Sequence, residues 1–107
     1  MANFKDAQLY CEKASPLFEE IGDKEEIGNC YLMMGAIYED QASYPKALEY
    51  YLKALKFNEE AGYKRGVGNS CSNIGVVYYR QSNYQKALEY FFKARSEERR
   101  VGKECRL

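Results

Sequence analysis

Apolar and polar residues follow one another along this chain with the period of an α-helix. Between residues 24 and 41, apolar or small residues recur three or four positions apart, which places them on one helical face. These residues are Ile27, Tyr31, Met34, Gly35 and Tyr38. The segment QAS at 41–43 interrupts the pattern, which resumes over residues 44–60. The pattern therefore predicts two consecutive helices joined by a short turn.

The same pattern recurs 40 positions later. Residues 61–94 align with residues 21–54 without a gap, and 15 of the 34 pairs are identical. Chance would give about one identity in fifteen to twenty at ordinary composition. The offset also reaches the N-terminus, where Phe4 matches Tyr44 and Ala7 matches Ala47. The chain is therefore predicted to hold helices at about 4–20, 24–41, 44–60, 64–81, and from 84 to 96 or beyond.

Polar and flexible residues mark the expected helix ends. Ser43 stands just before a predicted helix, where its hydroxyl can accept a free backbone N–H of the first turn. Asn83 and Asn3 occupy the same place one repeat later and earlier. Gly62, like Gly22 before it, falls between two units, where a residue in the left-handed conformation can end a helix.

The spacing of the packing residues resembles the tetratricopeptide repeat, whose pattern reads W-x2-L-G-x2-Y and then A-x3-F. The chain carries it as Tyr31-x2-Met34-Gly35-x2-Tyr38 with Ala47-x3-Tyr51, and as Cys71-x2-Ile74-Gly75-x2-Tyr78 with Ala87-x3-Phe91. The repeat spacing of 40 is longer than the usual one of about 34. It is similar to that of kinesin light chains and bacterial peptide-pheromone receptors, and the family's closing proline is absent.

This resemblance implies an all-α fold, an α-solenoid of antiparallel helix pairs with about five helices and two and a half tetratricopeptide repeats. Residues 1–20 would be the second helix of a truncated repeat. Residues 21–60 and 61–94 would each be a repeat, and 95–107 a tail outside the pattern. Small residues such as Gly35 and Gly75 would let neighbouring helices approach closely.

The resemblance also implies that the first helix of each unit lines a concave face, where such proteins commonly bind an extended peptide or a partner helix. Residues on the open side of these helices form what we call the binding stripe. Its members are Asn29, Leu32, Met33, Ala36, Glu39 and Asp40 in one unit, and Asn69, Ser72, Asn73, Val76, Tyr79 and Arg80 in the next. The two units differ most along this stripe, as expected of a surface that packing does not fix.

The side chains of the stripe suit a peptide, although each has a second interpretation. Asn69 and Asn73 lie four residues apart, and their amides can bond an extended backbone, or solvent, or a neighbouring helix. Met33 and Leu32 can form an adaptable apolar patch or cover an adjacent helix. Arg80 can pair with an acidic ligand or with a nearby carboxylate of the chain.

Composition narrows the possible partners. The 16 basic and 16 acidic residues give a formal net charge of zero, whereas nucleic-acid binding needs a basic excess. The eleven tyrosines are assigned to repeat packing rather than to stacking on bases. The sequence has no apolar run near the roughly 18 residues of a membrane span, and its N-terminus has no signal region. We therefore expect a cytoplasmic protein with a protein or peptide partner, no nucleic acid and no membrane.

The sequence has few of the residue types that usually carry catalysis or bind metal ions. The chain has no histidine, which removes the commonest general base and the usual partner of a nucleophilic Ser or Cys. Cys11, Cys30, Cys71 and Cys105 form no CxxC pair, so we expect small, half-buried free thiols rather than a zinc site. No enzyme activity, cofactor or metal is predicted.

Both ends of the expected stack are open, because neither carries a polar capping helix of the kind that usually ends a solenoid. Leu17, Phe18 and Cys11 are expected to be uncovered at the start, and Phe92 or Tyr90 at the end. This predicts self-association, either end to end or by exchange of helices.

The tail RSEERRVGKECRL departs from the repeat, since charged residues replace the apolar ones of the earlier units. It can be a basic peptide that docks on a partner, or a solvated extension of the last helix. Residues 95–106 also resemble the conceptual translation of a widely used sequencing adapter. The codons of this segment test that last interpretation.

The resemblance and the composition together favour a non-enzymatic interaction module that binds a peptide or helix on the concave face of a solenoid. The alternative is a structural spacer, a fragment of a larger regulatory or signalling protein with no ligand of its own.

Overall fold

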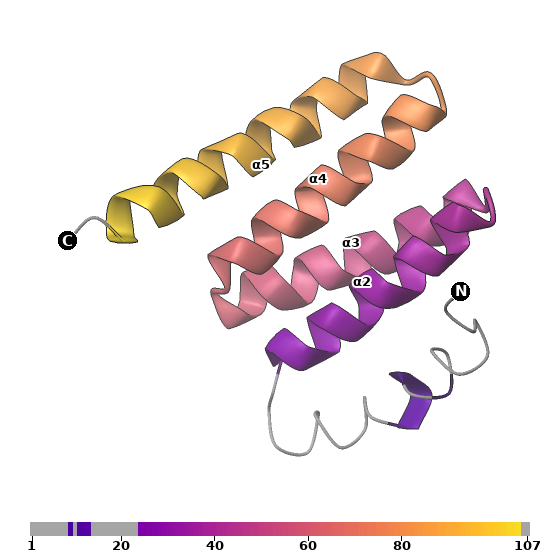
Figure 1. The fold of residues 1–107 in the computed structure, drawn as a ribbon, viewed down its shortest axis with the longest axis horizontal. Coiled ribbons are helices and arrows are strands. Elements are labelled where there is room, and N and C mark those ends of the chain that lie inside the picture. Colours follow the sequence, from indigo (N-terminus) through magenta and orange to yellow (C-terminus); the bar gives the residue numbers. More distant parts are fainter. Residues whose placement is uncertain (1–8, 10, 14–23, 106–107) are drawn as a thin grey trace.

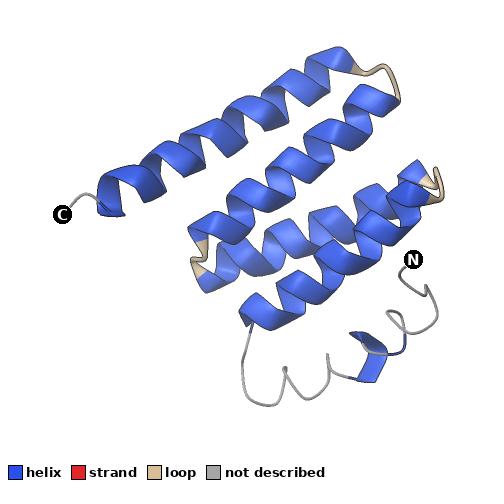
Figure 2. Cartoon of the chain, in the orientation of Figure 1, coloured by secondary structure: helices blue, strands red, loops and turns tan. Residues whose placement is uncertain are grey.

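The fold is a stack of antiparallel helix pairs. The computed structural model describes residues 9, 11–13 and 24–105, with side chains from 25 to 97 in the last range. Within that range lie α2 (Lys24–Asp40), α3 (Tyr44–Ala61), α4 (Lys64–Arg80) and α5 (Tyr84–Cys105). Figure 1 shows α2 paired with α3 and α4 paired with α5, and Figure 2 shows only helices and short loops in this part of the chain. The predicted all-α solenoid of helix pairs is confirmed.

The predicted starts of these helices, at residues 24, 44, 64 and 84, are confirmed. α5 continues past Ala94 to Cys105, within the tail. Of the first predicted helix, 4–20, residues 9 and 11–13 are helical and the rest lies outside the described residues. Asn3, Phe4, Ala7, Leu17, Phe18 and Gly22 lie there too. We call α2 and α3 the first unit, and α4 and α5 the second unit.

The helix ends agree with the sequence in two places and differ in one. Gly62 has φ +68° after α3, and its N–H donates to the carbonyl of Glu59, as expected of a left-handed cap. Asn83 Oδ1 accepts the backbone N–H of Lys86 at 3.4 Å. The hydrogen bond predicted for Ser43 is wrong, since its side chain makes none. Pro45 removes the N–H of the second helical residue, one of the two that such a cap can accept, and Ser43 does not use the other.

The turn between the two helices of a unit uses a left-handed residue that the sequence pattern did not indicate. Ala42 has φ 59° in the first unit and Ser82 has φ 63° in the second, although neither is glycine. The next residue donates its N–H back to the helix, from Ser43 to Tyr38 at 2.9 Å and from Asn83 to Tyr78 at 2.8 Å. The two turns are therefore built alike, and these hydrogen bonds offset a conformation that costs an L-residue about 1–2 kcal/mol.

Within each unit, an aromatic ring packs directly on a glycine of the facing helix. A Cβ added to Gly35 would lie 2.5 Å from the ring of Tyr51, and one added to Gly75 would lie 2.6 Å from the ring of Phe91. No real Cβ tolerates such contacts unless the ring moves. The predicted close approach of helices at these small residues is confirmed.

A second contact that recurs in both units joins tyrosines on the outer edge of the helix pair. Tyr38 stacks on Tyr50 with ring centroids 5.4 Å apart, and Tyr78 stacks on Tyr90 at 5.7 Å. A lysine lies over the first ring of each pair, Lys46 at 5.6 Å and its equivalent Lys86 at 5.3 Å. These tyrosines, identical in the two units, therefore contribute to packing within each unit.

The main core lies between the units, where α4 covers α3. Its buried members are Ala47, Tyr51, Leu55, Val67, Cys71, Ile74, Val77 and Ala94. Most of them lie at the three-and-four spacing noted in the sequence. The second unit therefore covers the apolar face that the first unit cannot cover alone.

A buried amide completes this junction. Asn58 is fully buried, and glycines of both first helices face its side chain, Gly28 from α2 and Gly66 from α4. Its Nδ2 donates to Ser70 Oγ at 3.2 Å, and Ser70 Oγ donates to the carbonyl of Gly66 at 2.8 Å. Asn58 Oδ1 has no hydrogen-bond partner among the described residues. The absence of a Cβ at the two glycines makes room for this amide between three helices.

Candidate functional site

The binding stripe predicted from the sequence lies on α2 and α4, the first helices of the two units. Asn29 and Asn69 are exposed at equivalent positions. Met33 is 43% exposed and Tyr79 is 60% exposed, although both are large and apolar in part. An exposed surface of this kind, amides beside apolar side chains, can bond a peptide backbone and cover an apolar ligand side chain at once.

The middle of the stripe is less open. Ser72, Asn73 and Val76 on α4 are half-buried, whereas Ala36 and Asp40 on α2 are exposed. Leu32, which we expected on the open side, is also half-buried and packs against the core between the units. The sequence allowed two interpretations of Leu32, an apolar patch for a ligand or a side chain that covers an adjacent helix. Its packing against the core fits the second interpretation for the buried part of the side chain.

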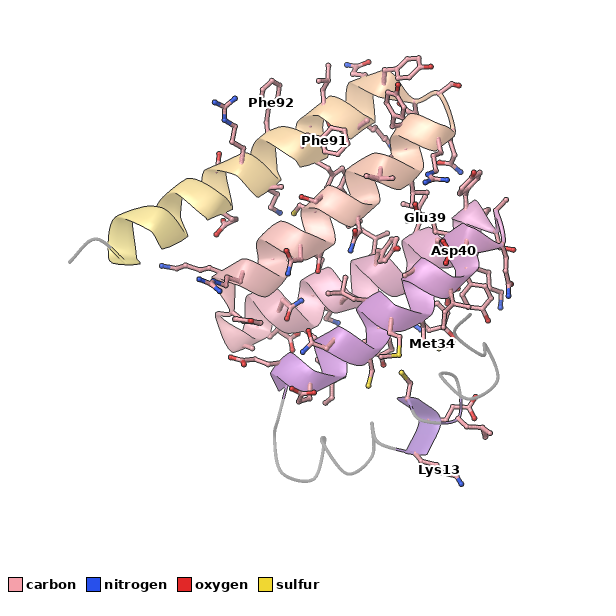
Figure 3. All side chains as sticks on the ribbon, viewed as in Figure 1. Lys13, Met34, Glu39, Asp40, Phe91 and Phe92 are labelled. Atoms are coloured by element: carbon pink, nitrogen blue, oxygen red, sulfur yellow. The ribbon has the colours of Figure 1, made fainter. Side chains whose placement is uncertain are left out.

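The C-terminal ends of α2 and α4 are joined by a network around Glu39, which Figure 3 labels beside Asp40. Arg80 Nε lies 3.2 Å from Glu39 Oε2, and the Tyr51 hydroxyl donates to Glu39 Oε1 at 2.9 Å. Arg80 is thus paired with a carboxylate of the chain. The network links three helices, because Tyr51 belongs to α3.

This network shifts the ionisation of Tyr51. Burial raises the pKa of the Tyr51 hydroxyl well above its ordinary value, and its hydrogen bond to the Glu39 carboxylate raises that pKa further. The hydroxyl therefore stays protonated and remains a donor to Glu39 at neutral pH.

The sequence interpretation missed the roles of Tyr51 and Asn58. A signal for the first was present, because Glu39 and Tyr51 in one unit become Tyr79 and Phe91 in the next. The carboxylate and the hydroxyl are thus both lost in the second unit, as expected of two groups that form a hydrogen bond with each other. For Asn58, the signal was a polar residue three positions after Leu55 and seven after Tyr51, on the apolar face of its helix.

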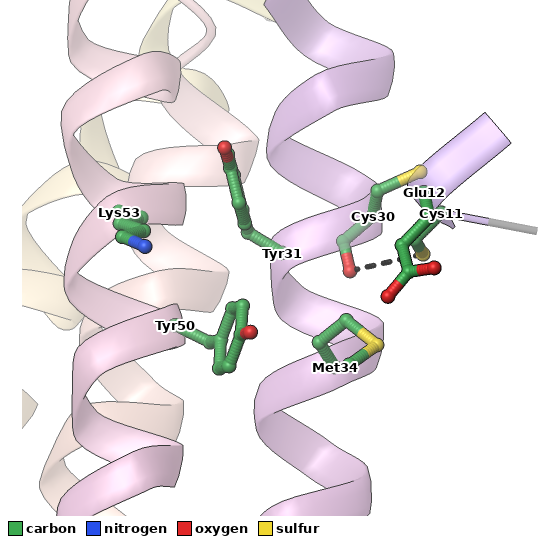
Figure 4. Close-up of a pocket in the computed structure, with 7 residues that line it drawn as sticks. All are labelled: Cys11, Glu12, Cys30, Tyr31, Met34, Tyr50 and Lys53. Atoms are coloured by element: carbon green, nitrogen blue, oxygen red, sulfur yellow. Dashed lines mark hydrogen bonds between the residues drawn. The ribbon is translucent and has the colours of Figure 1, made fainter. Parts of the chain in front are cut away.

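A pocket of about 270 Å³ lies away from the binding stripe, beside the N-terminal residues (Figure 4). It is lined by Cys11, Glu12, Cys30, Tyr31, Met34, Tyr50 and Lys53. The Lys53 ammonium lies 5.2 Å from the centre of the Tyr50 ring and 5.8 Å from that of Tyr31. Tyr31 also stacks on Phe57 at 5.4 Å. The wall of the pocket on this side is therefore aromatic and cationic.

The two thiols beside this pocket are buried. Cys11 was expected to be uncovered, and this is wrong: it is buried and its Sγ donates to the carbonyl of Cys30 at 3.5 Å. Burial, with a contribution from the Cys30 side chain, raises the pKa of Cys11 to about 12. Cys11, Cys30 and Cys71 are free thiols. A protonated thiol is a poor nucleophile, so Cys11 is not activated for attack.

In the described part of the chain, no three or more His, Cys, Asp or Glu side chains gather in a way that could hold a metal ion. Among the same residues, no helix combines the length and the apolar character needed to cross a bilayer.

Comparison with known proteins identifies the repeat. The tetratricopeptide repeat family matches residues 1–60 and again residues 34–96, so the two matches together cover the segment before the units, the first unit, and the second unit as far as residue 96. Among curated proteins, none shows significant similarity to the chain.

Proposed function

Since the chain belongs to the tetratricopeptide repeat family, we propose that it binds an extended peptide or a partner helix along the binding stripe of α2 and α4. Tetratricopeptide repeats are a non-catalytic type of repeat that generally mediates protein–protein interaction. The observation that carries the proposal is the exposure of Met33 one helical turn from the exposed amide of Asn29 on α2, together with the exposure of Asn69 and Tyr79 on α4.

The charged residues of the stripe indicate which charges a ligand should carry. The Arg80 guanidinium already pairs through Nε with Glu39, which Tyr51 also holds, so part of its charge is neutralised before a ligand arrives. Asp40 is exposed next to Glu39 on the same helix end. A ligand with apolar side chains for Met33 and Val76, and with a basic rather than an acidic residue near Asp40, therefore fits best.

Selection of peptides from a random display library, followed by fluorescence anisotropy with the peptides obtained, tests this function. Asn73→Ala and Tyr79→Ala are expected to weaken binding by about tenfold or more each, as central interface residues do. Lys56→Ala, an exposed change on α3 away from the stripe, is the matched control and should leave affinity unchanged. If no peptide binds saturably, the spacer interpretation is favoured instead.

Two further features complete the proposal. The chain associates with itself through the open end of the stack, where α5 has no neighbouring helix beyond α4 among the described residues. It works in a reducing compartment such as the cytoplasm, which suits the free thiols of Cys11, Cys30 and Cys71.

A further inference from the structure

The side chain of Arg80 is oriented by a series of contacts that begins in the core. The hydroxyl of Tyr51, on α3, donates to Glu39 Oε1 at 2.9 Å, and Glu39 Oε2 lies 3.2 Å from Arg80 Nε. The Tyr51 ring is itself enclosed, because it is 1% exposed and packs on Gly35. Only 13% of the Glu39 side chain is exposed. The core therefore holds a carboxylate in place, and that carboxylate holds one edge of the guanidinium.

The rest of the Arg80 guanidinium is available to a ligand. A guanidinium carries several N–H groups in one plane, and the contact with Glu39 is made at Nε. The structure shows no hydrogen bond from Nη1 or Nη2 to another described residue, and 54% of the side chain is exposed. Arg80 thus presents free donors to solvent from a position that another contact fixes.

This exposure does not arise because Arg80 lies in the last described unit. Asp40 occupies the equivalent place in the first unit, and it is exposed although α4 and α5 follow. The contact between Arg80 and Glu39 also lies between the two units, since Glu39 belongs to α2. By this comparison, a further helix pair after α5 would leave Arg80 accessible.

Arg80 continues the binding stripe along α4. Asn69, Asn73, Val76 and Arg80 follow one another at intervals of four, three and four residues, which places them on one face of the helix. Asn69 is exposed, and Asn73 and Val76 are half-buried. A row of amide, apolar and guanidinium groups suits an extended chain, whose carbonyl groups and side chains also alternate along its length.

The charges around Arg80 favour a neutral acceptor. Glu39 balances the charge of the guanidinium, and the exposed Asp40 follows Glu39 in α2. A carboxylate brought by a ligand would be repelled by both acidic side chains, whereas a main-chain carbonyl carries no net charge. Its oxygen can accept the N–H groups that Nη1 and Nη2 present.

We propose that Arg80 donates hydrogen bonds to a main-chain carbonyl of an extended peptide, and that Glu39 and Tyr51 are positioning residues that hold its guanidinium for this contact. The inference rests on the function proposed above and adds the chemical group that Arg80 recognises. It also gives a part in binding to Tyr51, a buried residue of α3 that lies outside the binding stripe.

The orientation of Arg80 can be tested on the protein alone by nuclear magnetic resonance. The Nε–H of Arg80 should exchange with water at least about threefold more slowly than that of Arg65, an exposed arginine of α4 with no ion pair among the described residues. Tyr51→Phe should bring the two rates closer together. Equal rates in the intact chain, or a difference that Tyr51→Phe does not change, would overturn the inference without touching the proposed function.

Binding measurements test the contact with the ligand. The probes are peptides selected from the display library that contain no Asp or Glu and end in an amide, so that they carry no carboxylate. Arg80→Met should raise their dissociation constant by about tenfold. Tyr51→Phe should raise it by about threefold in the intact chain, and should have no effect in a chain that already carries Arg80→Met. Equal effects of Tyr51→Phe in both chains would contradict a positioning role.

Two control variants separate geometry from charge. Arg80→Lys keeps the charge but not the planar donor group, so it should bind these peptides about as weakly as Arg80→Met, and full affinity would contradict the proposal. Lys56→Met removes an exposed charge on α3 and should leave affinity unchanged. Circular dichroism checks that each variant keeps its helices. If no peptide binds saturably, the proposed function fails together with this inference, whereas peptides that bind regardless of Arg80 overturn this inference alone.

Discussion

The two units are close copies in sequence, yet they differ in how completely the aromatic ring that packs on their glycine is buried. Tyr51 is 1% exposed, because α2 lies on one side of it and α4 covers the other. Phe91 makes the same contact with its own glycine but is only half-buried, since no described helix follows α5. The same repeat motif therefore gives an enclosed ring inside the stack and a half-exposed one in the last described helix.

Truncating the two equivalent rings should show this difference most strongly. Tyr51→Ala is expected to lower the free energy of unfolding by about 3–5 kcal/mol, the usual cost of removing a buried aromatic side chain. Phe91→Ala should cost about half as much, because less of its surface leaves water on folding. Urea unfolding at low protein concentration measures both. Equal losses would mean that the greater exposure of Phe91 does not reduce its contribution to stability.

The two glycines offer a second comparison. Gly35→Ala should cost about 1–2 kcal/mol, because the added methyl group meets the enclosed ring of Tyr51 and the gain in helix propensity offsets only part of the clash. Gly75→Ala should cost less, since the ring of Phe91 can move toward solvent.

Gly68→Ala is the control for those two variants. The nearest atom to a Cβ at Gly68 lies 3.7 Å away, an ordinary contact, so this variant should gain up to about 1 kcal/mol from helix propensity alone. A loss at Gly68 as large as that at Gly35 would show that the clash with Tyr51 is not the cause. Thermal unfolding followed by circular dichroism gives all three values.

The hydroxyl that distinguishes Tyr51 from Phe91 should have a measurable effect that depends on pH. Tyr51→Phe is expected to cost about 1–2 kcal/mol at pH 7, because Glu39 loses a hydrogen bond. Phe91→Tyr should bring no such gain, since Tyr79 stands where the first unit has Glu39.

The pH dependence follows from the raised pKa of Tyr51. The folded state keeps a proton that the unfolded chain releases near pH 10, so this stabilisation is complete below that pH and is lost as the pH rises further. The difference in unfolding free energy between wild type and Tyr51→Phe should therefore shrink above pH 10. A difference that stays constant from pH 8 to 11 would contradict the assigned shift.

The ion pair between the units should have the smallest effect. Arg80→Met is expected to cost less than about 1 kcal/mol, because the Arg80 side chain is mostly in solvent, and the loss should decrease in 1 M salt. Glu39→Gln should cost more than Arg80→Met, since Glu39 also accepts the Tyr51 hydroxyl. Urea unfolding at two salt concentrations checks both. A larger effect at Arg80 would mean that the ion pair, and not the hydrogen bond from Tyr51, dominates the network.

Much of the fold could be predicted from the sequence, because helical periodicity and a repeat of 40 are local or pairwise properties of the residues. The helical period also predicted which face of each first helix is open, and Asn29 and Asn69 are exposed there. It did not show that Leu32 is half-buried, because neighbouring helices decide how much of the open side stays open. The use of the stripe in binding and the adapter origin of the tail stay predictions.

The sequence by itself determined where the helices begin, which glycines and aromatic residues recur at fixed places in the repeat, and that one unit must cover the next. These follow from spacing, since a helix brings residues three and four apart onto one face whatever surrounds it. Only the tertiary structure decided that Asn58 would lie buried between Gly28 and Gly66, that Glu39 would pair with Arg80, and that Cys11 would be covered. Those contacts join different helices, and their geometry depends on how the helices cross.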